Sequence, residues 1–155
     1  MLFTEGADNP SSSSMQTDAW YQKLWNLDEV ANSSIVATTV RKTSSDPCPA
    51  GWRVPTMAEW VSIGADNSST GKTWNSSTHL LTISAVNSLQ LILPAAGYRN
   101  YSDGASNNQS ISGYYWASSV PSGSVSASSV YFNSASLNAT SSNRAYGFSV
   151  RCVQE

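Results

Sequence analysis

One stretch constrains the fold more than any other part of the chain. It runs from Asp46 to Trp60 and reads Asp-Pro-Cys-Pro-Ala-Gly-Trp-Arg-Val-Pro-Thr-Met-Ala-Glu-Trp. Each proline disfavours helical backbone in the residue before it, so the beginning of the stretch is extended. Thr56 and Glu59 match a capping box, in which each side chain accepts a hydrogen bond from the backbone amide of the other residue. The pattern predicts a helix that begins at Thr56 and buries Met57 and Trp60 on one face.

The second half of the chain has a different composition, rich in Ser, Asn, Tyr, Gly and Ala. Between Tyr101 and Ser149 the charged residues are Asp103 and Arg144 alone. Tyrosine gives large and fairly rigid contact area at low entropic cost, while Ser, Asn and Gly give adaptable hydrogen bonds, as in antibody paratopes. The tract therefore predicts a recognition surface, and we expect binding without catalysis.

Several segments have the β-branched and aromatic content of strands. The first is Ser34 to Arg41, and the apolar segment His79 to Leu93 fits a helix or a strand. Gly113 to Ser118 and Ser129 to Asn133 are expected to be neighbouring strands, and Ala145 to Val153 a third. Alternation predicts that Val130 and Phe132 are buried, and that Phe148, Val150 and Cys152 share one face.

Length and charge narrow the classes of function. A chain of 155 residues with formal net charge −2 fits one domain, which we place at residues 18–155 after a disordered leader over residues 1–17. The Lys and Arg clusters that nucleic acid requires are lacking, and no apolar run approaches the roughly 20 residues of a membrane helix. We expect neither nucleic-acid binding nor direct membrane insertion.

Catalytic and metal-binding patterns are weak. His79 is the single histidine, and it has no cysteine or histidine cluster around it in the sequence. The pattern thus predicts no nucleophile–base pair and no transition-metal site. Calcium needs six to eight oxygen ligands, and Asp103, Asn107 and Asn108 could supply some of them, although turn formation explains Asp103-Gly104 equally well.

The contact candidates are the tyrosines embedded among small polar residues and the polar side chains near them. For each tyrosine the alternative is a half-buried strand residue with a satisfied hydroxyl. Trp52, Trp60 and Trp116 lie in patterned segments and are expected in the core. The predicted ligand-binding residues are Tyr101, Asp103, Asn107, Asn108, Tyr114, Tyr131, Asn133, Ser134, Ser136, Asn138 and Asn143, with Tyr146 as a further candidate.

Two cysteines, Cys48 and Cys152, leave two possibilities open. They are either buried free thiols, as in a cytosolic protein, or a disulfide. We favour the disulfide, because closing a loop of about a hundred residues stabilises a fold by up to about 4.7 kcal/mol in the chain-entropy model. A disulfide would place the protein outside the reducing cytosol.

The segment Trp52 to Trp60 resembles the Arg-Leu-Pro-Thr-Glu-Ala-Glu-Trp signature of the formylglycine-generating-enzyme branch of the C-type lectin fold. With Gly97-Tyr-Arg-Asn100, Tyr115-Trp-Ala-Ser118 and Arg144 to Cys152, the chain is similar to the Fibrobacter succinogenes major paralogous domain over roughly Val40 to Val153. The resemblance implies an α+β, C-type-lectin-like fold. It would have a small antiparallel sheet, one or two helices, and long irregular display loops near Asn100 to Ser112 and Tyr131 to Asn143.

The same resemblance implies a function and supports the pairing of Cys48 with Cys152. Such domains occur in bacterial surface lipoproteins and adhesins, and among the variable proteins of diversity-generating retroelements. The enzyme's chemistry needs paired C-terminal cysteines, and here Cys152 is the only one in that region. We therefore expect an extracellular, non-enzymatic display domain on a bacterial surface or phage virion that binds protein or glycan on a host or neighbouring cell. The alternative is a structural surface lipoprotein or pilus-associated module without a specific ligand.

Overall fold

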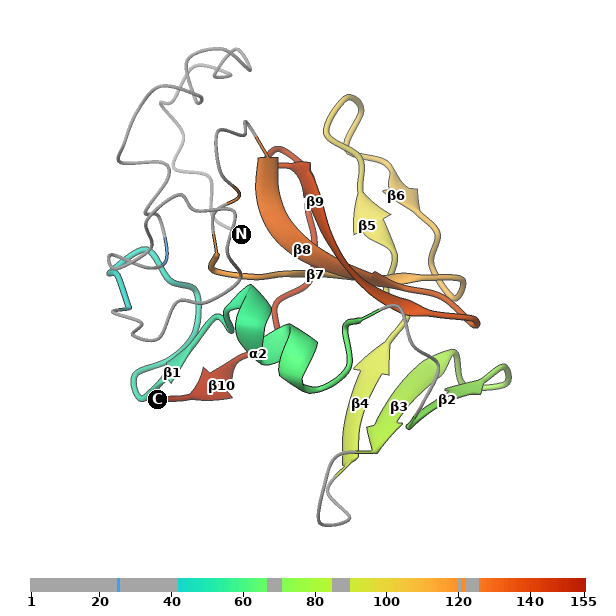
Figure 1. The fold of residues 1–155 in the computed structure, drawn as a ribbon. Helices are drawn as coiled ribbons and strands as arrows, with labels where there is room; N and C mark the ends of the chain where they lie inside the picture. The colour runs from blue at the N-terminus through green and yellow to red at the C-terminus, as the bar shows by residue number, and fades with distance from the viewer. Residues whose placement is uncertain (1–24, 26–41, 67–70, 85–89, 120, 122–125) are drawn as a thin grey trace.

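The computed structural model describes Trp25 and residues 42–66, 71–84, 90–119, 121 and 126–155. The predicted leader over residues 1–17 and the predicted strand Ser34 to Arg41 lie outside the described residues. The described part is built mostly of short antiparallel strands that form several small sheets (Figure 1). Its elements are β1 (Trp52–Arg53), α2 (Met57–Ser62), β2 (Lys72–Asn75), β3 (Leu80–Ser84), β4 (Gln90–Pro94), β5 (Tyr98–Arg99), β6 (Ser106–Asn107), β7 (Gly113–Trp116), β8 (Ser126–Phe132), β9 (Leu137–Asn143) and β10 (Val153–Gln154).

The expected α+β, C-type-lectin-like class is wrong for this structure. The described residues contain one short helix, α2, against four small antiparallel sheets with the orders β1-β10, β2-β3-β4, β5-β6 and β7-β8-β9. The segment His79 to Leu93, left open between helix and strand, supplies β3 and most of β4. Strand pairing prevails because Leu81, Ile83 and Leu93 fall on one buried face at the two-residue period of a strand.

The predicted helix start is confirmed. The Thr56 hydroxyl accepts from the Glu59 amide at 3.2 Å, and the Glu59 carboxylate accepts from the Thr56 amide at 2.8 Å. Met57 and Trp60 are buried as expected. These reciprocal bonds satisfy two amide groups that a helix start leaves without intrahelical partners.

The sheet β7-β8-β9 confirms part of the predicted strand arrangement. The segments around Gly113 and Ser129 do pair, and Val130 and Phe132 are fully buried. The third strand is not Ala145 to Val153, however. It is β9, which follows β8 through a tight turn and pairs with it over its whole length. For the same reason, the display loop expected from Tyr131 to Asn143 is mostly strand.

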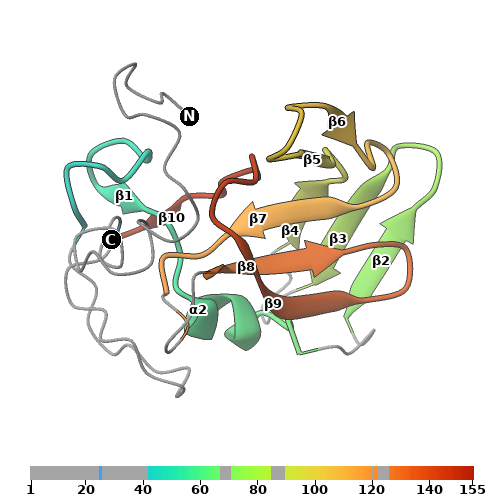
Figure 2. The same cartoon turned by 90° about the horizontal axis from the view of Figure 1, so that it is seen from above.

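The segment after β9 instead joins two sheets. The Arg99 and Gly147 backbones form a bridge with two hydrogen bonds, of 2.8 and 3.0 Å, and Ser149 forms a parallel bridge with Tyr115 on β7. The chain near Gly147 and Ser149 therefore lies between β5 and β7 (Figure 2). Phe148, Val150 and Cys152 are half-buried, so their expected core face is only partly formed.

The core lies between α2 and the two three-stranded sheets. The helix contacts β8 and β9, and Trp60 lies at 6.0 Å from the ring of Tyr115. Trp60 and Trp116 are buried, which confirms their predicted core positions, whereas Trp52 is 44% exposed and the prediction is wrong for it. The largest fully buried side chains are Trp60, Phe132, Leu93, Leu137, Val54 and Val130.

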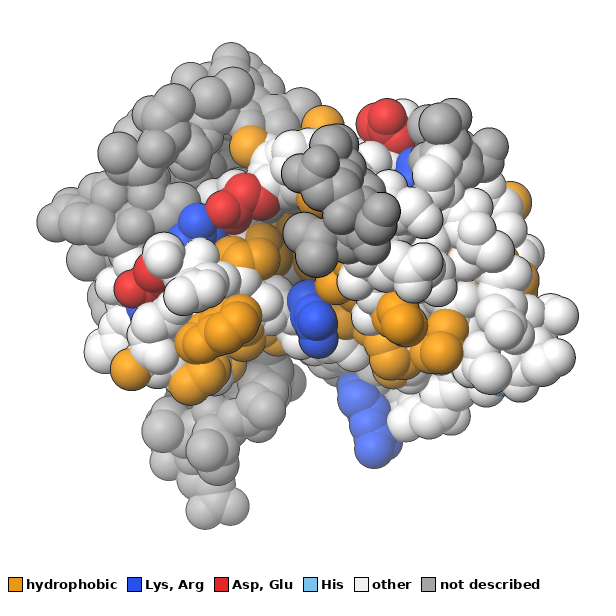
Figure 3. Space-filling model, turned by 90° about the horizontal axis from the view of Figure 1, so that it is seen from below, with side chains coloured by type: hydrophobic (Ala, Val, Ile, Leu, Met, Phe, Trp, Pro, Cys, Tyr) orange, Lys and Arg blue, Asp and Glu red, His pale blue; other side chains and the backbone are white. Residues whose placement is uncertain are grey.

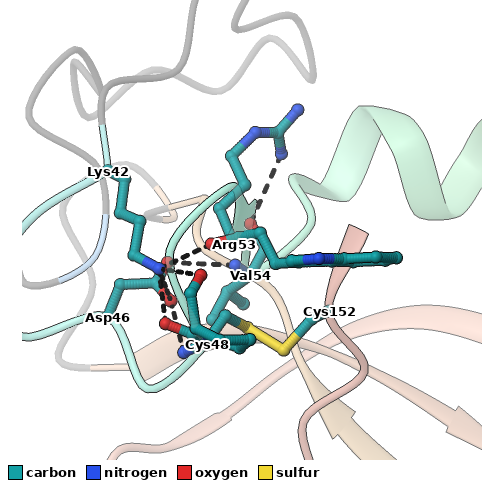
Figure 4. Close-up of a disulfide and its surroundings, with 8 residues drawn as sticks. Lys42, Asp46, Cys48, Arg53, Val54 and Cys152 are labelled. Carbon is teal, nitrogen blue, oxygen red and sulfur yellow. Dashed lines mark hydrogen bonds and ion pairs between the residues drawn. A yellow bond between two sulfur atoms is a disulfide. The ribbon is translucent and has the colours of Figure 1, made fainter. Parts of the chain in front are cut away.

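A polar and covalent frame holds β1 (Figure 4). Cys48 and Cys152 form the predicted disulfide, which confirms the pairing. The buried carboxylate of Asp46 accepts from the amides of Cys48 at 2.8 Å and Val54 at 3.0 Å. The Lys42 ammonium donates to the backbone oxygens of Cys48, Pro49 and Trp52.

Candidate binding surface

The face of β7 and β8 that points away from the core carries aromatic rings. Side chains alternate along a strand, so Tyr115 and Val130 face the core while Tyr114 and Tyr131 face outward. The outward pair is in direct register, and its ring centroids lie 5.0 Å apart. Cross-strand aromatic pairs of this kind stabilise a sheet and hold each ring in place.

Further rings extend this pair across the neighbouring strand β5. Tyr98 lies 4.9 Å from Tyr114 and 5.3 Å from Tyr146, and Tyr146 lies 4.9 Å from Tyr101. The register of the backbone bridges explains this continuity, because Gly147 is held against Arg99 and Ser149 against Tyr115. We call the resulting surface the tyrosine face; it consists of Tyr98, Tyr101, Tyr114, Tyr131, Tyr146 and Phe148.

A buried tryptophan lies beside the tyrosine face, because Trp116 is two residues after Tyr114 on β7 and its side chain is on the same side of the strand. Trp116 is 2% exposed, and its ring stacks on Phe148 with centroids 4.3 Å apart and an interplanar angle of 27°. Phe148 in turn stacks on Tyr146 at 5.4 Å and contacts Tyr114 at 5.1 Å. The rings thus pack against one another in one aromatic layer, which limits the freedom that they would lose on binding.

Two asparagine amides fix phenolic hydroxyls at the edges of the face. Asn108 Nδ2 donates to the hydroxyl of Tyr114 at 3.2 Å, and Asn133 Nδ2 donates to that of Tyr131 at 2.8 Å. Each hydroxyl keeps its own proton to donate. The face can therefore bury rings and still offer oriented hydrogen bonds to a ligand.

Two tyrosines of the face have raised pKa values. Burial raises the pKa of Tyr114 above its ordinary value, and the lost solvation with the nearby Tyr101 and Tyr98 hydroxyls raises the pKa of Tyr146. In the core, burial raises the pKa of Tyr115 to about 12, where its hydroxyl donates to the Pro94 carbonyl at 2.9 Å. The hydroxyls of Tyr114 and Tyr146 consequently carry no charge near neutral pH.

The predicted tyrosines are brought together, with different exposure. Tyr101 is 54% exposed, whereas Tyr114, Tyr131 and Tyr146 are half-buried in the aromatic layer. Asn108 and Asn133 contact the face through the two amide bonds described above. On β9, Asn138 lies opposite Tyr131 in register and donates to Ser136 Oγ at 3.0 Å.

The remaining predicted polar residues shape turns, lie at a strand end or pair within the β5–β6 ladder. The Asp103 carboxylate accepts from the Ala105 amide at 2.9 Å in the turn between β5 and β6. Asn143 is at the far end of β9 and accepts from the Ala145 amide at 3.0 Å. Ser134 is exposed in the β8–β9 turn, and Asn107 pairs with Tyr98 in the β5–β6 ladder.

Sequence reasoning missed two members of the face, Tyr98 and Phe148. The motif Gly97-Tyr-Arg-Asn100 gives no sign that Tyr98 is on a surface, and the alternation around Phe148 predicts a core position. The positions of both follow from the insertion of the C-terminal segment between β5 and β7, which joins residues about fifty positions apart. An available signal was the pair of aromatics at Tyr146 and Phe148, whose two-residue spacing puts them on one side of an extended segment.

The described residues contain no group of three or more His, Cys, Asp or Glu side chains that could hold a metal ion. For calcium, the Asp103 carboxylate is engaged in its turn, and the Asn108 backbone oxygen already accepts from Ile111 and Ser112. His79 has φ 55° and packs 6.3 Å from the ring of Trp74. It lies at the start of β3, in a different sheet from the tyrosine face.

Charge is unevenly distributed over the molecule. Three ion pairs, Lys42–Asp46, Arg53–Glu59 and Lys72–Asp66, join residues between positions 42 and 72. Seen from below, the surface carries several separate groups of hydrophobic side chains, with Lys and Arg side chains between two of the groups (Figure 3).

In the described part of the chain, no helix is long and apolar enough to span a bilayer.

A family model describes nearly the whole chain. The Fibrobacter succinogenes major domain matches residues 2–154. This chain belongs to that family. The match confirms the predicted resemblance to the Fibrobacter succinogenes major paralogous domain. The chain matches no curated protein and no solved structure.

Proposed function

We propose that this member of the Fibrobacter succinogenes major domain family is a non-enzymatic ligand-binding domain, and that the tyrosine face is its binding surface. The observation that carries the proposal is the continuous contact of five tyrosine rings on one uncharged surface. Buried aromatic side chains dominate binding hot spots, and tyrosine is among the residues most enriched there.

The packing around the rings favours binding over a purely structural role. Exposed rings on a loose loop would lose much conformational freedom on association, which weakens binding. Here Tyr114 and Tyr131 are paired across two strands, Phe148 packs beside Tyr114, and Trp116 stacks on Phe148. A ligand therefore meets a surface that is already ordered.

We further propose that the domain acts outside the cytosol, on a bacterial cell surface or a phage virion, as an adhesin-like module. The Cys48–Cys152 disulfide supports this location, because such bonds persist mainly in oxidising compartments. The ligand is protein or glycan on a host or neighbouring cell. The Tyr, Ser and Asn content of residues 101–143 is also what a variable protein of a diversity-generating retroelement would carry.

The test is a binding screen of the purified protein against a glycan array and a panel of intact bacterial and host cells. Tyr114→Ala and Tyr131→Ala are expected to weaken the binding of any positive probe by at least about tenfold, as for hot-spot aromatics. Trp52→Ala is the matched control, because Trp52 is an exposed aromatic on β1, outside the face. Equal losses in all three variants, or no loss in the tyrosine variants, would refute the proposed site.

The structural-module alternative has its own supporting observation. Several Asn side chains serve local structure: Asn75, Asn100, Asn133 and Asn143 each accept backbone amides in turns. Sequencing the same locus across isolates separates the two functions. A display domain should vary between Tyr101 and Asn143 while Trp52 to Trp60 stays fixed, whereas a structural module should vary equally little in both segments.

A further inference from the structure

We infer that Ile111 is a second anchor of the binding surface, and that the partner of the tyrosine face is a protein with an apolar pocket rather than a glycan. This inference rests on the proposed function. Ile111 lies in the loop 108–112 between β6 and β7 and is 63% exposed, the most exposed large hydrophobic side chain among the described residues. An isolated exposed isoleucine is ordinary on a protein surface, so the argument depends on how the loop presents it.

The loop holds Ile111 outward by means of an unfavourable backbone conformation. Asn108 has φ 57° and Ser110 has φ 63°, so two residues with side chains adopt the left-handed region within three positions. Asparagine tolerates this region, but for serine it costs free energy that the surrounding structure must offset. Backbone strain of this kind concentrates at ligand-binding sites.

Hydrogen bonds and close packing determine this conformation. The Asn108 carbonyl accepts from the amides of Ile111 at 3.1 Å and Ser112 at 3.0 Å, and Ser110 donates to the Ala95 carbonyl at 2.8 Å. On the inner side the loop packs directly against Gly97. A Cβ added there would lie 2.0 Å from the Asn107 oxygen and 2.7 Å from the Gln109 nitrogen. The loop is therefore a rigid support for Ile111.

The same loop is tied to the tyrosine face. Asn108, which begins it, donates through Nδ2 to the hydroxyl of Tyr114 at 3.2 Å. After Ser112, the loop continues directly into β7, which carries Tyr114. Because Asn108 contacts the Tyr114 hydroxyl, the inference places Ile111, three positions further along this loop, at the edge of a ligand that lies over Tyr114.

Two features of this combined surface favour a protein partner. An isoleucine side chain offers no hydrogen bond, so a sugar covering it would leave hydroxyl groups without partners, which is costly. The rings also form no flat platform for a sugar, because Tyr146 stands at 90° to Tyr98 and 87° to Tyr101. A protein surface can supply an apolar pocket for Ile111 and a shape complementary to the tilted rings.

Charge argues for an uncharged partner patch. From Tyr98 to Ser149 the charged residues are Arg99, Asp103 and Arg144. Arg99 alternates with Tyr98 along β5 and so lies on the opposite side of that strand, where its guanidinium donates to the Gly104 carbonyl at 3.1 Å. A carboxylate or ammonium of the partner buried on the tyrosine face would lose its hydration without a counter-charge, at a large cost. Binding should accordingly change little between low and high salt.

The experiment uses the full chain and three variants, Ile111→Ser, Ile111→Leu and Ile92→Ser. Ile92 on β4 is 47% exposed and is the matched control, because it lies in a different sheet from the loop. The probes are a printed glycan array and intact bacterial and host cells, the cells taken before and after treatment with proteinase K or with periodate. Thermal unfolding of each variant checks that it remains folded.

We expect cell binding that proteinase K abolishes and periodate leaves intact. Ile111→Ser should weaken it at least about tenfold, as the loss of a buried aliphatic anchor would, while Ile111→Leu retains most of it and Ile92→Ser changes nothing. If Tyr114→Ala abolishes binding and Ile111→Ser leaves it intact, this inference is overturned but the proposed function is not. Binding to the glycan array, or loss of cell binding after periodate, likewise overturns this inference and leaves the proposed function in place. Absence of binding to every probe overturns the proposed function, and this inference with it.

Discussion

The frame around β1 and the tyrosine face use opposite interactions within one chain. In the frame, the disulfide, the Asp46 carboxylate and the Arg53–Glu59 ion pair fix backbone positions by directional contacts. On the tyrosine face, rings contact rings and two amides orient hydroxyl groups, without a charged group. The comparison shows that directional polar and covalent contacts are used in the frame to hold the fold. On the tyrosine face, rings and hydroxyl groups remain available to contact a ligand.

This contrast separates stability from binding. Substitutions in the frame should destabilise the fold, whereas substitutions of exposed rings should leave the fold almost unchanged and remove binding. The supports of the face are expected to lie between these two cases, since they affect both properties.

The largest effect is expected from the disulfide. Replacing both Cys48 and Cys152 with Ala opens a covalent loop with a sequence separation of 104 residues. The double variant should lose about 2–5 kcal/mol of unfolding free energy, as is typical when a native disulfide is removed. Urea unfolding of the double variant and of the wild type with and without reductant measures this loss. Equal stabilities would show that the frame does not depend on its covalent bond.

The second-largest loss of stability is expected at Gly97, which packs against the β6–β7 loop beside the tyrosine face. Gly97 has φ 68°, and a Cβ there would collide with the backbone of the β6–β7 loop. Gly97→Ala should therefore cost roughly 2–4 kcal/mol, from the left-handed conformation together with the forced shift.

Gly104 is the matched control for this substitution. It lies in the same hairpin with φ 69°, and a Cβ there has nothing within 4 Å. Gly104→Ala should cost only the conformational part, about 1–2 kcal/mol. Chemical unfolding of both variants compares them, and equal costs would mean that the loop does not pack on Gly97.

A smaller effect concerns pH. The hydrogen bonds from Arg53 lower the pKa of Glu59 below its ordinary value, at N–O distances of 2.8 and 2.6 Å. A carboxyl whose pKa is lowered by folding stabilises the protein above its unfolded pKa, and this contribution disappears as the pH falls through the folded pKa. The stability advantage of the wild type over Glu59→Gln should thus shrink from pH 7 towards pH 3. An advantage that is constant with pH would contradict the ion pair.

The smallest effect on stability is expected at the most exposed ring. Tyr101 is 54% exposed and contacts Tyr146 edge to face. Tyr101→Ala should cost less than about 1 kcal/mol, while it weakens binding to any probe that Tyr114→Ala also affects. A larger loss of stability in thermal or urea unfolding would assign Tyr101 to the core rather than to the binding surface.

The local features of the fold could be predicted from the sequence. Thr56 and Glu59 lie three positions apart and determine a helix start by themselves, and the alternation around Val130 and Phe132 determines their burial. The pairing of Cys48 with Cys152 was also predictable, because the described chain has no other cysteine to compete.

The long-range arrangement could not be predicted, for physical reasons. Residues Ala145 to Val153 have the alternation of a strand, yet the neighbouring β9 takes the place beside β8, because a tight turn brings it there first in the chain. The composition of the second half indicated a tyrosine-rich surface, but not that Gly147 would pair with Arg99 and so bring Tyr98 and Tyr146 together. Such contacts depend on strand order, which local patterns do not encode.

Hydroxyl-radical footprinting of the full chain, read by peptide mass spectrometry, tests the central claim most directly. If the tyrosine face is an ordered surface open to solvent, Tyr101 should be modified fastest and Tyr114, Tyr131 and Tyr146 at intermediate rates. Tyr115, which is 4% exposed, should be protected until the protein unfolds. Protection of Tyr101 equal to that of Tyr115 would contradict the account.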